Sequence, residues 1–336
     1  MSTTTPASPA APPTATLTVF RLASLFTFLA VAMGAVVCAT GSGASCPTWP
    51  GCRPDTIAPQ WELSPVIEFT HRVGAIGAGP FVLAAAVLSL RLHRPVRWVR
   101  VMPWVALAGA VAAGVFGRMV VVGHLPTALG AVDLFSALTA MTVIGTSTIV
   151  LGRVPVRPDP VAAGPDDGAP SPHRLRATAG EPAVPLAAAA VVAVVALHVT
   201  GIFAAGTGSY TRCLGWPLWR TIGSDLHPWL QYTRLGLAGV AAVLVAATAA
   251  VAVRSDRLRG WGVAVAALFA GELALGLVIR SGGLDQGVAA GYSVLAAALL
   301  WSLGLLGAVA WTLPARPPAG PDGPAHEIGE HLVASA

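Results

Sequence analysis

The chain has 336 residues, of which 55% are hydrophobic and only 10% are charged. In soluble domains about a quarter of the residues are charged, so this composition indicates a protein embedded in a membrane. The formal net charge is +5, and every basic side chain counted in it is arginine because the chain contains no lysine. These arginines alternate with apolar stretches instead of gathering in one segment, which argues against a nucleic-acid partner.

Eight apolar runs are long enough to cross the roughly 30 Å hydrocarbon core of a bilayer as helices. In chain order they cover 17–39, 66–90, 99–122, 125–151, 183–206, 229–253, 259–280 and 284–313. The predicted fold class is therefore all-α, a polytopic membrane protein with eight transmembrane helices. The first run lacks the basic flank of a signal peptide, so we expect it to remain in the mature protein.

The predicted helices form two sets of four, separated by a segment rich in Pro, Gly and Asp. We expect five parts: a disordered N-terminal tail at 1–16, a first four-helix bundle at 17–151, a linker at 152–182, a second four-helix bundle at 183–313, and a disordered C-terminal tail at 314–336. Both tails are rich in Pro and small residues and have little apolar surface to bury.

Arginine also predicts the orientation. It is concentrated in the connections 91–100, 152–182 and 254–259. Loops rich in Lys and Arg stay on the cytoplasmic side of a membrane. We therefore expect a multi-pass protein of the cell membrane with both termini and the linker in the cytoplasm. The connections after the first and fifth helices then face the outside.

Those two outward connections share a motif. Thr-Gly-Ser followed by Cys-x-x-Trp-Pro occurs at 40–50 and again at 207–217. Each copy follows one apolar run and precedes the next, which predicts that the two bundles arose by duplication. The first copy also contains Cys52, where the second has Trp219. Cys46 and Cys52 share one short loop on the oxidising side, so a disulfide is expected, with two free thiols as the alternative.

The densest group of ionisable side chains lies near the start of the second predicted helix, in the segment Glu68-Phe-Thr-His71-Arg72. Residues three and four apart lie on one face of a helix, so Glu68, His71 and Arg72 are predicted neighbours. Ionisable groups at the edge of an apolar span are costly and usually functional. An interfacial cap, with Arg72 reaching toward water and paired with Glu68, is the structural alternative. Imidazole is also a common axial ligand of haem iron in helical bundles.

The loop motif followed by Glu-x-Thr-His-Arg resembles the haem A synthase family, and the resemblance covers about 17–313. It implies oxidation of a methyl group of haem O to the formyl group of haem A for cytochrome oxidase. It further implies a substrate haem O in one half and a haem B cofactor in the other, each held between histidines of the second and fourth helices. Cys46, Cys52 and a catalytic Glu68 belong to the same pattern. Lipid, haem, haem O synthase and cytochrome oxidase assembly factors are the implied partners.

Only His71 is present among the four implied histidine ligands. Aligning the two halves through the repeated loop places Arg234, Asp133 and Tyr292 at the other three positions. Arginine has no lone pair for iron, but Arg234, like Arg72, could bind a haem propionate. Tyr292 could ligate ferric iron as tyrosinate or pack with its hydroxyl bonded.

Three further residues leave the site open to more than one interpretation. Asp133 is costly within its span unless paired, and His71, Arg72 and Arg118 are its candidate partners. His198 is either a hydrogen-bonded bundle histidine or a replacement ligand, and His227 could approach the edge of a haem. Two functions therefore remain: a haem A synthase-like enzyme, or a non-catalytic haem-binding or oxidase assembly protein that kept the bundle.

Overall fold

The computed structural model describes residues 14–92, 97–122, 126–153, 182–204, 228–282 and 285–313. Within them are eight helices, each long and apolar enough to cross a membrane. They are α1 (Thr14–Ala39), α2 (Leu63–Leu90), α3 (Arg97–Val122), α4 (Thr127–Arg153), α6 (Ala183–Ala204), α7 (Pro228–Arg254), α8 (Arg259–Gly282) and α9 (Gln286–Trp311). The prediction of an all-α, multi-pass membrane protein is confirmed. Most of both predicted tails and of the linker, the second loop copy at 207–217, His124 and His227 lie outside the described residues.

Local sequence explains where several helices begin. The Asp285 side chain accepts hydrogen bonds from the backbone N–H groups of Gly287 (2.8 Å) and Val288 (3.2 Å), so it caps the first turn of α9. Pro228 is the first residue of α7, a position where the missing N–H costs nothing. Helix α2 begins at Leu63, three residues before the predicted run.

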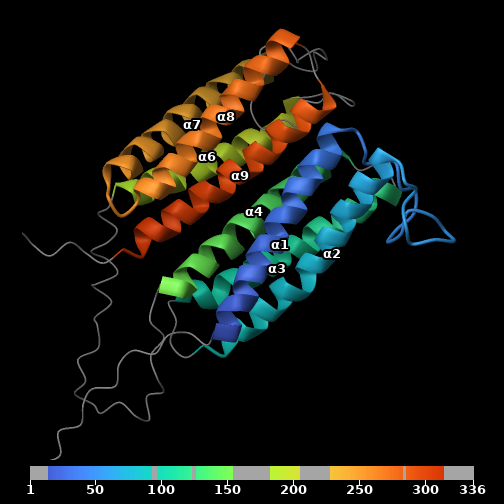
Figure 1. The fold of residues 1–336 in the computed structure, drawn as a ribbon, viewed down its shortest axis with the longest axis horizontal. Helices are drawn as coiled ribbons and strands as arrows, with labels where there is room; N and C mark the ends of the chain where they lie inside the picture. The colour runs from blue at the N-terminus through green and yellow to red at the C-terminus, as the bar shows by residue number, and fades with distance from the viewer. Residues whose placement is uncertain are drawn as a thin grey trace, which may run out of the picture.

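The helices pack as two groups, which Figure 1 shows as two neighbouring layers of rods. In the first bundle α1 contacts α2 and α4, and α3 contacts the same two helices. In the second bundle α6 contacts α7 and α9, and α8 contacts the same pair. Helices α2 and α4 are therefore diagonal neighbours across the first bundle, as α7 and α9 are across the second. The duplication that would explain this likeness remains a prediction.

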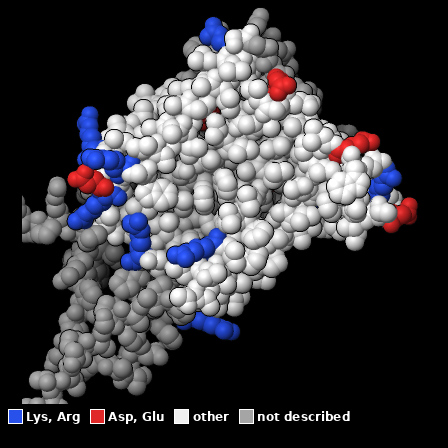
Figure 2. Space-filling model, in the orientation of Figure 1, with Lys and Arg blue, Asp and Glu red and all other residues white. Residues whose placement is uncertain are grey.

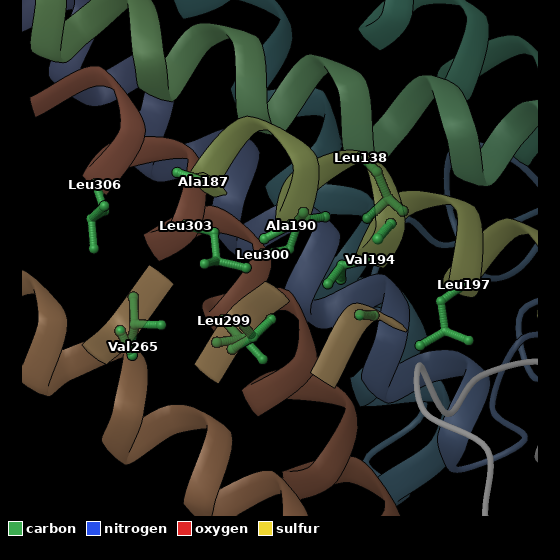
Figure 3. Packing of buried hydrophobic residues seen from close by; sticks show 14 of the residues in the cluster. Leu138, Ala187, Ala190, Val194, Leu197, Val265, Leu299, Leu300, Leu303 and Leu306 are labelled. Carbon is green, nitrogen blue, oxygen red and sulfur yellow. The ribbon is translucent and has the colours of Figure 1, made fainter. Parts of the chain in front are cut away.

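The two bundles meet through α1 and α4 on one side and α6 and α9 on the other. Phe28 stacks on Trp301 with ring centroids 4.7 Å apart. Gly145 leaves room for the same indole, because a Cβ there would lie 2.8 Å from Trp301 Nε1. Figure 3 shows Leu138 of α4 beside α6, and Leu138 belongs to the same core cluster as Leu300 and Leu303 of α9.

We name the two ends of the molecule for what they carry. At the loop end, residues 40–62 join α1 to α2, and the Gln286 side chain of α9 reaches the Thr40 carbonyl over 3.4 Å. At the opposite arginine end lie Arg91, Arg97, Arg100, Arg153, Arg254, Arg257 and Arg259. Figure 2 shows most of the visible basic side chains at this end. This separation is what the predicted orientation requires, and the sides themselves remain a prediction.

The apolar core is distributed differently in the two bundles. In the second bundle it continues to the loop end, where it includes Leu197, Ile279 and Ala289. In the first bundle every member of its own core cluster lies in the half nearer the arginine end: Phe20, Ala23, Val82, Ala85, Leu92, Val99, Ala106, Ile144, Val150 and Leu151, with Ala308 of α9. In the loop half of α2 the buried side chains include the charged Glu68 and Arg72.

Candidate functional site

Glu68 and Arg72 form a buried ion pair at the loop end of α2. They are one turn apart on the helix, and only 3% and 5% of their surfaces are exposed. Both carboxylate oxygens are engaged: Oε1 accepts from Arg72, while Oε2 accepts from the backbone N–H of Cys46 at 2.9 Å and the hydroxyl of Ser45 at 3.0 Å. The predicted pairing of these two residues is therefore present, but inside the protein rather than at a solvated edge.

The same pair holds the loop between α1 and α2. The Arg72 guanidinium donates to the carbonyl oxygens of Cys46 (2.8 Å), Gly51 (3.0 Å) and Thr48. With the bond to Glu68, these contacts use four of the five N–H donors of the arginine. Arg72 thus anchors three points of one loop, and its predicted contact with a cofactor stays a prediction.

A disulfide closes the anchored loop. Cys46 and Cys52 are bonded to each other, and both are buried. This confirms the disulfide expected from the sequence. On the outer side of the loop, the Arg118 guanidinium of α3 lies 5.7 Å from the centroid of the Trp49 ring, within the range of a cation–π contact. The loop is therefore fixed against α2 and α3 before any ligand binds.

His71 lies beside this anchor and turns toward α1. Its Nδ1 is 3.0 Å from the carbonyl oxygen of Ala30. Because a carbonyl can only accept, Nδ1 carries the proton, and a neutral ring keeps its lone pair on Nε2. Gly34 makes the approach possible, since a Cβ at that position would lie 3.0 Å from Cε1 of the imidazole. The ring is therefore held in the tautomer that metal ligation through Nε2 requires.

In the second bundle a glycine of α6 likewise admits a side chain of α7, but that side chain is an arginine instead of a histidine. A Cβ on Gly201 of α6 would lie 2.9 Å from Nη2 of Arg234 on α7. Gly201 follows Gly34 by 167 residues, the same separation as that between Cys46 and Cys213 (213 − 46). Arg234 therefore occupies the place in the second bundle that His71 has in the first, which supports the predicted alignment of the halves. A guanidinium in that place cannot ligate iron.

Two other predicted residues lie near Arg234. Tyr292 of α9 and His198 of α6 are both close enough to interact with its charge. Arg234 and Tyr292 are each 2% exposed. Nδ1 of His198 lies 2.7 Å from the Val194 carbonyl of its own helix, so His198 has the hydrogen bond expected of a bundle histidine. Among the residues that the structure describes in this bundle, Arg234 and Tyr292 do not fit a second haem held by two histidines.

The structure thus brings Glu68, Arg72, Cys46 and Cys52 together, with His71 on the adjoining helical face. It places Arg234 and Tyr292 together in the other bundle. Sequence reasoning missed Gly34 and Gly201, although a signal was present, because each glycine precedes the motif cysteine of its half by 12 residues (46 − 34 and 213 − 201).

Comparison with known proteins gives a partial match. No family model matches the chain. A heme A synthase of Bacillus cereus (strain AH187) is 29% identical over 110 residues, which is 32% of this chain and 35% of that protein. The heme A synthases of Bacillus anthracis (strain CDC 684 / NRRL 3495) and Bacillus thuringiensis subsp. konkukian (strain 97-27) match equally well. The match spans about a third of the length of these relatives. It makes the chain a distant relative of the heme A synthases.

Proposed function

We propose that this chain is a haem A synthase-like membrane protein that binds haem in the loop half of its first bundle, through Nε2 of His71. The observation that carries the proposal is the imidazole itself, which is tied by Nδ1 to the Ala30 carbonyl beside a glycine that admits the ring. Haem would supply the redox chemistry, while the chain holds and encloses the porphyrin.

The surroundings of His71 support this choice of half. His71 shares an inward stripe of α2 with Ala78, Val82 and Ala85, which follow it by 7, 11 and 14 residues. The last two of these belong to the apolar core of the first bundle, and that core stops before the level of His71. On this stripe of α2 an imidazole therefore takes the place that apolar side chains have nearer the arginine end, and histidines on inward faces are how helical bundles hold a haem.

The anchored loop supports a role for Glu68 and Arg72 at the mouth of this site. Together they fix the backbone of Cys46, Thr48 and Gly51 over the end of the bundle. The loop would then limit the access of water to a haem below it. Proton transfer by Glu68 would require its carboxylate to leave two loop donors, so its catalytic role is a proposal that a Glu68→Gln variant must test separately from loop order.

The oxidation of haem O to haem A is the activity that the relationship favours. The second candidate is a haem-binding or oxidase assembly protein without this activity, and Arg234 is the observation that favours it, because it removes a ligand from the second bundle. Co-expression with a haem O source, followed by chromatography of the extracted haem, separates the two. Haem A accumulation supports the enzyme, haem O or haem B bound without haem A supports the second candidate, and a protein free of haem contradicts both.

A further inference from the structure

Asp133 of α4 lies diagonally across the first bundle from His71. It shares an inward stripe of α4 with Ala140, Ile144 and Leu151, which follow it by 7, 11 and 18 residues and are all buried. Ile144 and Leu151 belong to the core of the first bundle. Asp133 therefore faces the same interior as His71, from the opposite corner.

The two residues also lie at similar depths. His71 follows the first residue of α2 by eight positions and Asp133 follows the first residue of α4 by six, or about 12 Å and 9 Å along the two helices at 1.5 Å per residue. Both helices begin at the loop end. A planar ligand between the diagonal helices would have His71 on one face and Asp133 on the other.

Asp133 has no hydrogen bond or ion pair with any residue in the described ranges. Its expected partners are engaged elsewhere: Arg72 with Glu68 and the loop, His71 through Nδ1 with Ala30, and Arg118 over Trp49. A carboxyl group inside an apolar span is costly unless it has a polar partner or keeps its proton. The interior toward which it faces is the proposed haem site.

We propose that the haem held by His71 is five-coordinate, and that Asp133 hydrogen-bonds a small oxygen-containing molecule, water or dioxygen, on the open face of the iron. The proposal rests on the function proposed above. Asp133 is then a specificity-determining group for the molecule that reaches the iron, and among the residues that the structure describes no histidine of α4 opposes His71.

The test is a spectroscopic comparison of the full-length protein, purified with its haem, in ferrous form and after addition of carbon monoxide. The wild type should show a high-spin ferrous spectrum and bind carbon monoxide. Asp133→His should give a six-coordinate, low-spin spectrum and bind carbon monoxide at least about tenfold more slowly, because a second imidazole must first leave. Asp133→Asn should stay five-coordinate and shift the C–O stretching frequency, which reports polar groups near the bound molecule.

Ser147→Ala is the matched control. Ser147 is a buried polar residue of α4 in the other half of the bundle, and its hydroxyl bonds the Val143 carbonyl at 2.8 Å. This variant should leave the C–O stretch unchanged. A six-coordinate, low-spin wild type would overturn the open face, and a C–O stretch that Asp133→Asn does not move would overturn the role of Asp133. A wild type without haem would instead overturn the proposed function.

Discussion

Replacing Arg72 by leucine tests the loop anchor, because leucine keeps apolar volume and removes every donor. The variant loses the ion pair with Glu68 and the bonds to three loop carbonyls. It also leaves a carboxylate that is 3% exposed without its counterion. Breaking one side of a buried pair costs about 3–5 kcal/mol. We expect that loss to appear as easier opening of the loop, with the helices intact.

Hydrogen exchange at the Cys46 amide measures this opening, because its N–H donates to Glu68. A loss of about 3–5 kcal/mol corresponds to exchange that is faster by roughly 10² to 10³ or more, up to complete loss of protection. The control is Arg259→Leu, which removes an ion pair whose side chains are 63% and 90% exposed and should cost less than about 1 kcal/mol. Unchanged exchange at Cys46 in Arg72→Leu would refute the anchor.

Three further substitutions test separate parts of the structure. Gly34→Ala places a methyl group 3.0 Å from the His71 ring and should weaken haem retention. A variant that holds haem as the wild type does would contradict the claim that Gly34 makes room for the imidazole. Asp285→Ala removes the cap of α9 and should lower the free energy of unfolding by about 1 kcal/mol, measured by denaturation in detergent. Gly145→Ala meets the rigid indole of Trp301 at 2.8 Å and should destabilise the contact between bundles by about 1–3 kcal/mol, with a lowered melting temperature as the readout.

The sequence predicted the eight helices because apolar length is set by the bilayer and not by tertiary contacts. Helix ends were less accurate where polar residues belong to the first turn. Helix α2 begins at Leu63 and includes Ser64, whereas the apolar run begins at Val66. Such a turn is fixed by backbone hydrogen bonds, which hydropathy does not report.

The sequence also predicted the neighbours within one helix, because Glu68, His71 and Arg72 follow helical spacing. It did not predict that Arg72 would bind three loop carbonyls, or that His71 would bind the carbonyl of Ala30. Every residue has the same backbone carbonyl group, so the residue types do not indicate which carbonyl will accept a hydrogen bond. The choice depends on how the loop folds.

The haem content of the purified protein tests the central claim most directly. We predict about one haem per chain in the wild type, its loss in His71→Ala, and its retention in His198→Ala, whose imidazole bonds its own helix. Loss of haem from His71→Ala with the bundle still folded would support His71 as the ligand. Full haem content in His71→Ala would contradict this assignment, and two haems per wild-type chain would contradict a single haem site.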